Sequence, residues 1–201
     1  MQGRLWEVEG ELNLQDASIV IHRQYFSPLI ASAYLKRLKS VSWKQEELIV
    51  FGKKHLEPRE TAWYGDKEAS YTYSGLTHKP KPWIPVLDEI RNDVTAIARA
   101  SFNSVLANRY RDGQDGVAWH ADDEFELGEN PVIGSVSFGQ TRRFQLRHKY
   151  EPRAVVSLDL HHGDLMVMSG GTQKFWEHQI PKTKQSITER INLTFRNINH
   201  G

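Results

Sequence analysis

Several features that would define a protein class at once are missing from this chain. Its 201 residues include no cysteine, which excludes disulfides and thiolate metal ligands, so any bound metal must be held by histidine and carboxylate side chains. No apolar run approaches the roughly 18 residues that cross a bilayer, and the N-terminus lacks the charged-then-apolar layout of a signal peptide. These absences favour an intracellular protein without membrane contact, cytoplasmic if the host is bacterial and nuclear if it is eukaryotic.

An excess of either charge is missing as well. The chain carries 26 basic and 25 acidic residues, a net charge of +1, whereas nucleic-acid-binding proteins are often strongly basic. The basic residues still form five short clusters, which permit a basic surface facing phosphates but which solvated surface explains equally well. These clusters are Lys36-Arg37-Lys39, Lys53-Lys54, Arg142-Arg143, Arg147-His148-Lys149 and Lys182-Thr183-Lys184.

The patterning predicts one α+β domain over residues 1–201. Ser27-Pro28 opens a predicted helix that runs to Lys39, and an apolar stripe from Val86 to Ala98 predicts a second helix. Short alternating segments predict strands near 19–21, 48–51, 102–110, 133–138, 143–147, 155–160, 165–168 and 188–197. Two helices followed by many short strands fit a double-stranded β-helix (jelly roll) with the helices packed outside.

His120 and Asp122 form a candidate metal-binding pair. Residues two apart in a strand project from one face, so their imidazole nitrogen and carboxylate oxygen can converge on one point. With one more histidine they would make the two-His-one-carboxylate triad that suits Fe(II) oxygenases. Most His-x-Asp pairs are surface polar residues, and the spacing alone does not decide between the two interpretations.

The last predicted strand has a polar face that carries two guanidiniums, formed by Arg190, Asn192, Thr194 and Arg196. A doubly cationic face that points into a barrel would be costly unless it held an anion, and guanidiniums pair with carboxylates bidentately. A solvated outer face is an equally good interpretation of the same residues.

His178 is the third candidate ligand. It follows Phe175-Trp176 and precedes Pro181, which places it at the end of a predicted loop before the arginine-bearing strand. Most of the remaining histidines are interpreted as surface residues: His22, His55, His78, His148, His161, His162 and His200.

Taken in order, His120-x-Asp122, His178, and Arg190 with Arg196 resemble the AlkB family of Fe(II)- and 2-oxoglutarate-dependent dioxygenases. The likeness runs from about Ile49 to Asn197 and is closest to the mammalian-type DNA-repair demethylase homologues. Further matching segments are Asn108-Arg109-Tyr110, Pro82-Trp83-Ile84-Pro85, residues 135–139 (Ser-Val-Ser-Phe-Gly), Arg147-His148-Lys149 and the whole of 190–196.

The resemblance implies a catalytic jelly-roll core at about 101–197 and a nucleotide-recognition lid at about 41–80. It implies Fe(II) ligation by His120, Asp122 and His178, which would be the catalytic centre. It also implies that 2-oxoglutarate is held by Asn108, Tyr110, Arg190, Asn192, Thr194 and Arg196. The implied reaction uses O₂, removes N-methyl groups from bases such as 1-methyladenine and 3-methylcytosine in DNA, and releases succinate, CO₂ and formaldehyde.

Substrate contacts are implied mainly for the lid. A damaged base must leave the stack to reach the iron, and the segment 53–75 interleaves aromatic and basic residues, as suits base stacking and phosphate contact. Some of these aromatics must instead anchor the loop on the core. The implied substrate-binding residues are Phe51, Arg59, Tyr71, Tyr73, Ser74 and Glu124, with Phe51 as a wedge in duplex DNA. Tyr73 stands where the nearest relatives have phenylalanine, which leaves the base preference open.

Three other functions stay open at this point. The same chemistry could act on RNA, although a wedge favours duplex DNA because single strands need no plug. A non-catalytic nucleic-acid-binding relative could keep the fold without iron, although all three ligands are intact. Hydroxylation of a small molecule or a protein side chain fits less well with an aromatic, basic lid. The expected partner is alkylated DNA, bound by a monomer.

We predict that Phe51→Ala weakens repair of duplex DNA more than repair of single strands, because only the duplex has a stack to fill. The ratio of demethylation rates on the two forms of one methylated oligonucleotide measures the effect. Equal losses on both forms would contradict a wedge.

Overall fold

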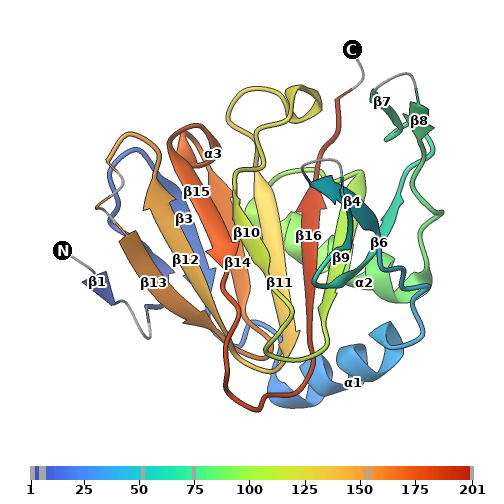
Figure 1. Cartoon of the computed structure of the whole chain (residues 1–201), viewed down its shortest axis with the longest axis horizontal. Coiled ribbons are helices and arrows are strands. Elements are labelled where there is room, and N and C mark those ends of the chain that lie inside the picture. Colours follow the sequence, from blue (N-terminus) through green and yellow to red (C-terminus); the bar gives the residue numbers. More distant parts are fainter. Residues whose placement is uncertain are drawn as a thin grey trace.

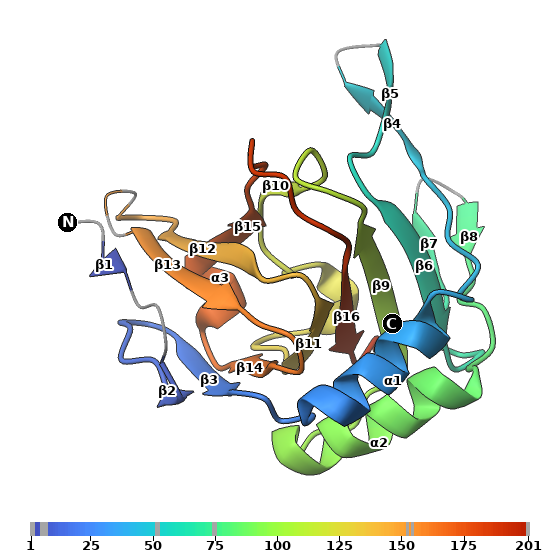
Figure 2. The same ribbon diagram turned by 90° about the horizontal axis from the view of Figure 1, so that it is seen from below.

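Figure 1 shows the computed structural model of the chain. The structure describes residues 3–4, 8–50, 53–73, 76–151, 153 and 155–199, with side chains for 8–47, 54–70, 79–151, 153 and 155–199. Two β-sheets face each other, and two helices cover the outer face of the larger sheet (Figures 1 and 2). The predicted α+β double-stranded β-helix is confirmed.

The smaller sheet has five strands, which are antiparallel to their neighbours except for β1 against β13. In spatial order they are β1 (Gly3–Arg4), β13 (Val155–Leu160), β12 (Arg142–His148), β15 (Trp176–Ile180) and β10 (Val117–His120). The strands predicted near 143–147 and 155–160 are confirmed, whereas β15 was not predicted.

The larger sheet has seven strands and contains most of the predicted ones. In spatial order they are β2 (Gly10–Glu11), β3 (Ser18–His22), β14 (Leu165–Ser169), β11 (Ile133–Gly139), β16 (Arg190–Arg196), β9 (Ser104–Tyr110) and β6 (Glu60–Gly65). Because β16 lies between β11 and β9, it is paired along its whole length and is fixed on both edges.

Both predicted helices are present. They are α1 (Pro28–Leu38), preceded by Ser27, and α2 (Pro85–Ala98), and each has proline in its first turn, where a missing N–H costs nothing. Two shorter helical segments are η1 (Phe125–Leu127) and α3 (Thr172–Phe175). Among the residues described, no helix is long and apolar enough to cross a membrane.

Two apolar cores hold the layers together. One lies between the helices and the larger sheet, where Ile90 and Val94 of α2 pack in one cluster with Leu193 and Phe195 of β16. The other lies between the two sheets and includes Ile19, Ile133, Leu146, Leu158 and Met166, all almost fully buried. The alternating strands therefore contribute to both cores, as period-two patterning requires.

Two short hairpins lie outside both sheets and within the predicted lid region. They are β4 (Glu47–Val50) with β5 (Lys53–Leu56), and β7 (Tyr71–Tyr73) with β8 (Leu76–His78). Figure 2 shows β4 and β5 projecting away from the body of the domain.

We predict that Arg99→Gly raises the free energy of unfolding. Arg99 ends α2 in the left-handed conformation, with φ of 51° and ψ of 38°, which costs a residue with a Cβ about 1 kcal/mol and glycine almost nothing. As a matched control, Ala96→Gly in the exposed part of the same helix should lower the free energy of unfolding by about 0.5–1 kcal/mol. Urea denaturation measures both, and a loss of stability in Arg99→Gly would contradict the prediction.

Candidate metal centre and anion pocket

A cavity of about 430 Å³ lies between the two sheets and brings together most of the predicted site residues. Its lining includes side chains from β9, β10, β15 and β16 and from the loops beside β5 and β10. The predicted site residues that line it are Arg59, Asn108, Tyr110, His120, Asp122, Glu124, His178, Arg190, Asn192, Thr194 and Arg196.

The two imidazoles lie side by side because β10 pairs with β15. His120 is directly opposite His178 in this antiparallel register, and their ring centroids are 4.3 Å apart. The prediction that His178 ends a loop is wrong, since it lies inside β15. Residues 176–180 alternate between buried and half-buried positions, which is the period of a strand and turns His178 inward.

Asp122 lies beside the two imidazoles, but it is not placed there by the strand alternation that the sequence suggested. β10 ends at His120, so strand alternation does not place Asp122. Instead its backbone N–H donates to Oε1 of buried Gln173 at 2.9 Å, and Nη2 of Arg196 donates to its Oδ1 at 2.5 Å. One ligand atom from each of His120, Asp122 and His178 lies within 4.8 Å of the others, which is close enough for all three to bind one metal ion.

The hydrogen bonds and burial of the three side chains suit metal binding. His120 Nδ1 lies 2.8 Å from the carbonyl of Ala118, which can only accept, so Nδ1 donates there and Nε2 is the nitrogen left for a metal. Burial lowers the pKa of His178 to about 3, which keeps its imidazole neutral. Burial also acts to raise the pKa of Asp122, but the charge and the hydrogen bond of Arg196 act in the opposite direction, and the pKa is lowered. Two imidazoles and a carboxylate are the donor set that suits Fe(II).

Arg190 lines the pocket, is almost fully buried and has unused hydrogen-bonding capacity. It is 1% exposed, its Nη2 donates to Oγ of Ser137 at 2.8 Å, and its guanidinium lies over the ring of Tyr110 at 5.3 Å. Burial lowers its pKa to about 10, so it remains a cation at neutral pH. Among the described residues, its Nε and Nη1 have no hydrogen-bond partner. A buried cation with two free donors fits a carboxylate ligand.

The rest of the polar face of β16 is already ordered. Asn192 donates to Oγ of Ser135 at 2.9 Å and accepts from the hydroxyl of Thr194 at 3.0 Å. With Asn108 on neighbouring β9, these side chains line the wall between the metal ligands and Arg190. Of the two interpretations that the sequence left open for this face, the structure supports the one in which it points into the barrel.

The structure describes the side chains of only two of the six predicted substrate-binding residues. Arg59 lies on the cavity wall and pairs with Glu57, and Glu124 lies at the exposed start of η1, also on the cavity. Phe51 and Ser74 lie outside the described residues. Tyr71 and Tyr73 have a described backbone in β7, but their side chains lie outside the described part.

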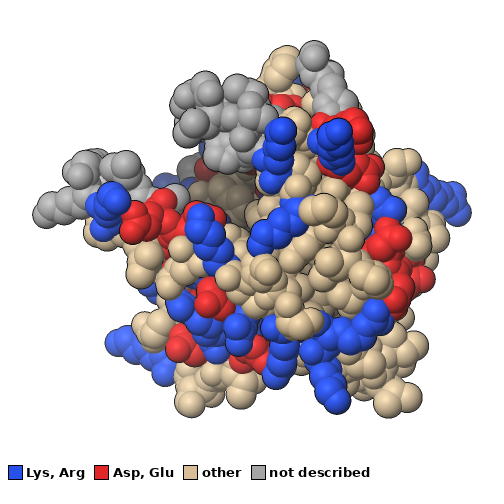
Figure 3. Space-filling model, turned by 90° about the vertical axis from the view of Figure 1, so that its right-hand side faces the viewer, with Lys and Arg blue, Asp and Glu red and all other residues tan. Residues whose placement is uncertain are grey.

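Two expectations about surface residues are wrong. Arg142 was interpreted as a solvated or phosphate-binding residue, but it is 3% exposed and donates to the backbone carbonyls of Asp112, Asp115 and Pro181. His148 was placed on the surface, but it is buried with its ring stacked 6.2 Å from that of Phe175. On the face in Figure 3, basic residues lie interspersed with acidic ones.

Sequence patterns missed two supports of the metal site. Gln173 in α3 fixes the backbone of Asp122, and Phe144 of β12 stacks against His178 with ring centroids 5.3 Å apart. The alternation of β12 could have indicated that Phe144 faces inward. Nothing local in the sequence marks Gln173.

Comparison with known proteins gives a consistent result. The sequence model of the 2OG-Fe(II) oxygenase superfamily matches residues 18–196. The human protein named DNA oxidative demethylase ALKBH2 is 49% identical over 156 residues, covering 74% of this chain and 60% of that protein. The bovine protein named alpha-ketoglutarate-dependent dioxygenase alkB homolog 3 is 43% identical over 176 residues, covering 83% of this chain and 61% of the relative.

A plant relative and a solved structure extend the likeness over most of the chain. The Arabidopsis thaliana protein named DNA oxidative demethylase ALKBH2 is 36% identical, covering 92% of this chain and 68% of the relative. The solved structure titled OsALKBH1 shares the fold, with a TM-score of 0.61 at 16% identity, covering 89% of this chain and 97% of that one. The chain spans about three fifths of the length of the mammalian relatives named above.

We predict that Arg190→Gln lowers the affinity for 2-oxoglutarate by about 10- to 100-fold, because a hydrogen bond to a charged group contributes about 1.5–3 kcal/mol. The ligand-free variant should be at least as stable as the wild type, because a buried cation without a counter-ion is removed. Calorimetric titration and thermal unfolding measure the two effects. Arg109→Gln, on β9 but outside the cavity, is the control, and unchanged affinity in Arg190→Gln would contradict this role.

Proposed function

Because the chain belongs to the 2OG-Fe(II) oxygenase superfamily and, within it, to the AlkB homologues, we propose that it is an oxidative demethylase of N-alkylated bases in DNA. The cofactor of this family is Fe(II), and its cosubstrates are 2-oxoglutarate and O₂. The observation that carries the proposal is the convergence of His120, Asp122 and His178 beside buried Arg190, in a chain 49% identical to a protein named DNA oxidative demethylase. The products would be succinate, CO₂ and formaldehyde.

The residues of the pocket divide the work between metal and cosubstrate. His120, Asp122 and His178 would hold Fe(II), which, when bound together with 2-oxoglutarate and O₂, supplies the oxidation of the N-methyl group. Arg190, at the buried end, would pair with one carboxylate of 2-oxoglutarate through its free N–H groups.

Arg196 lies beside the metal ligands and keeps one oxygen of Asp122 occupied, which fixes the direction of the carboxylate. Its Nε, buried and without a partner among the described residues, is a donor for the second carboxylate of 2-oxoglutarate. Asn108, Tyr110, Asn192 and Thr194 would complete the wall that excludes water.

For substrate, we propose that residues of about 41–80 act as the nucleotide-recognition lid over the core at about 101–197. Arg59 and Glu124 line the same cavity as the metal ligands, so a flipped base that enters it would meet both. The proposed contacts of Tyr71, Tyr73 and Ser74 with the base, and of Phe51 with the duplex, extend this proposal to the β4–β5 and β7–β8 hairpins.

We also propose that the protein is a monomer and that it acts inside the cell, where its nucleic-acid substrate is found. One chain supplies all three metal ligands and both guanidiniums, so no partner subunit is needed to build the site. RNA is the second candidate substrate, since base, lid and iron chemistry would be the same. Two of the relatives above are named DNA demethylases, which favours DNA.

The proposal is tested by incubating the chain with Fe(II), 2-oxoglutarate and a panel of methylated oligonucleotides. The panel holds 1-methyladenine and 3-methylcytosine in single-stranded DNA, duplex DNA and RNA, and mass spectrometry detects loss of the methyl group. Formaldehyde and succinate should appear in equal amounts. Methyl loss from RNA alone would favour the second candidate, and no methyl loss anywhere would refute the proposal.

We predict that Asp122→Ala abolishes 2-oxoglutarate turnover with methylated oligonucleotide, because it removes one of three metal ligands and leaves Arg196 unpaired. Asp123→Ala is the matched control, since this neighbouring carboxylate is exposed and pairs with Lys149. Succinate formation measures both variants. Undiminished turnover in Asp122→Ala would remove Asp122 from the site.

A further inference from the structure

The β4–β5 hairpin takes its direction from the contacts at its base. Figure 2 shows it projecting away from both sheets, so neither sheet supports its strands. At the base, Lys44 and Thr61 exchange backbone hydrogen bonds of 3.0 and 2.8 Å, and Glu57 N–H donates to the carbonyl of Glu46 at 2.8 Å. The angle at which the hairpin leaves the core therefore depends on how these few residues are attached to it.

The core side of this attachment is a turn between β9 and β10 that is fixed in place. Asp115 is 3% exposed, and Nη2 of buried Arg142 donates to its carbonyl at 2.8 Å and to that of Pro181 at 2.9 Å. A Cβ on Gly116 would lie 2.6 Å from the carbonyl oxygen of Ile180, so the turn is packed directly against the backbone after β15. The Asp115 carboxylate is thus a rigid anchor.

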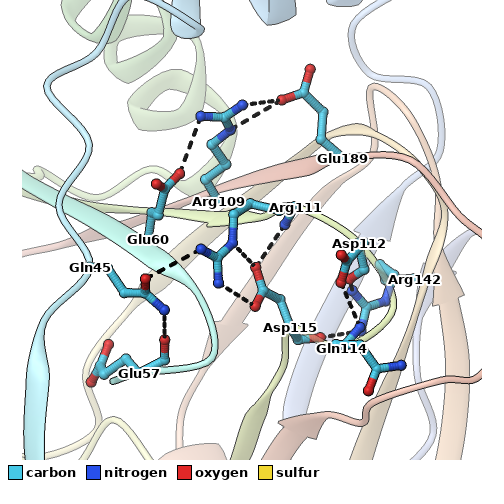
Figure 4. A network of polar contacts seen from close by, with 10 residues as sticks. All are labelled: Gln45, Glu57, Glu60, Arg109, Arg111, Asp112, Gln114, Asp115, Arg142 and Glu189. Atoms are coloured by element: carbon cyan, nitrogen blue, oxygen red, sulfur yellow. Dashed lines mark hydrogen bonds and ion pairs between the residues drawn. The ribbon is translucent and has the colours of Figure 1, made fainter. Parts of the chain in front are cut away.

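Arg111 connects this anchor to the base of the hairpin, as Figure 4 shows. Its Nε and Nη2 donate to the two carboxylate oxygens of Asp115 at 2.8 and 2.9 Å, and its Nη1 donates to Oε1 of Gln45 at 3.3 Å. The amide of Gln45 then donates to the carbonyl of Glu57 at 2.7 Å. One guanidinium therefore links the core turn to both arms of the hairpin base.

The bidentate pair makes Arg111 a stiff link rather than a mobile surface cation. A guanidinium fork held at two points on a buried carboxylate has few remaining conformations, so its third donor is already aimed at Gln45. The pKa of Asp115 agrees with this arrangement, since burial acts to raise it but the hydrogen bonds and charge of Arg111 lower it.

The cavity wall has further attachments besides this link. The N–H of Gly116 donates to the carbonyl of Pro58 at 2.8 Å, and Arg59 pairs with Glu57 beside the cavity. Loss of the contact between Arg111 and Gln45 would therefore loosen the hairpin, while the hydrogen bond from Gly116 still holds Pro58 at the cavity wall.

We propose that Arg111 and Gln45 are positioning residues that set the direction of the β4–β5 hairpin and thereby favour double-stranded over single-stranded substrate. The inference rests on the proposed function in one respect, that the hairpin meets the duplex. A hairpin held in one direction loses little freedom when it engages a duplex, whereas a loose one must be ordered at that moment. A single strand reaches the metal without the hairpin and gains nothing from it.

Activity tests the second half of the proposal. We predict that Gln45→Ala and Arg111→Lys each lower the ratio of kcat/KM for duplex to kcat/KM for single-stranded methylated DNA by about fivefold, the effect of one hydrogen bond. Arg111→Lys keeps a cation beside buried Asp115, so the fold is retained while the link is lost. Arg109→Lys, two residues earlier in β9 and paired with Glu60 and Glu189, is the matched control and should leave the ratio unchanged.

A distance measurement tests the first half without any reaction. Because the chain has no cysteine, spin labels on His55→Cys in β5 and Ala96→Cys in α2 report the hairpin direction in the full chain. The distribution of distances between the labels should be narrow in the otherwise unchanged protein and broader in Gln45→Ala and Arg111→Lys.

Each outcome decides one part. An unchanged distribution refutes the positioning role, and a broader distribution with an unchanged activity ratio refutes the effect on substrate choice. Equal activity losses on both substrates would show a general structural role and also overturn the inference. If the wild type demethylates neither substrate, the proposed function fails, while the distance measurement still decides the positioning role.

Discussion

The two-sided packing of β16 is the constraint on which the rest of the molecule depends. Its odd-numbered residues Ile191, Leu193 and Phe195 are fully buried in the core beneath the helices. Its even-numbered residues, 190 to 196, line the cavity on the opposite face. Pairing with β11 on one edge and β9 on the other prevents a shift of register, which would exchange the two faces. The helices therefore hold the pocket in place although none of their residues lines it.

The electrostatics of the pocket are costly and therefore informative. Asp122 and Arg196 are a nearly buried pair, and each offsets the desolvation of the other. Among the described residues Arg190 has no ion-pair partner, and it contacts the hydroxyl of Ser137 and the side chain of Tyr110. A buried cation with unused donors fits a site that binds an anion, since the anion supplies the missing charge and hydrogen bonds. The chemistry of the site and the family assignment therefore both indicate a carboxylate ligand.

Local patterning predicted the elements, and tertiary contacts decided what it could not. Ser27-Pro28 and the apolar stripe from Val86 to Ala98 correctly predicted the two helices. Alternation in β16 gathered the polar residues on one face but did not decide whether that face points inward. His178 was misplaced because β15 is short and its strand character depends on pairing with β10 and β12. The position of Asp122 depends on a hydrogen bond to Gln173, which lies about fifty residues later in α3. Arg142 is buried against backbone carbonyls and His148 against an aromatic ring, and these partners meet them only in the folded chain.

The incomplete neutralisation of Arg190 makes the stability of the folded chain sensitive to an anion bound beside it. A ligand that binds only the native state adds to its stability, by about 2.7 kcal/mol at one hundred times Kd. Proteases in cells remove the unfolded fraction. A keto-diacid that pairs with Arg190 would therefore protect the native chain against both unfolding and proteolysis.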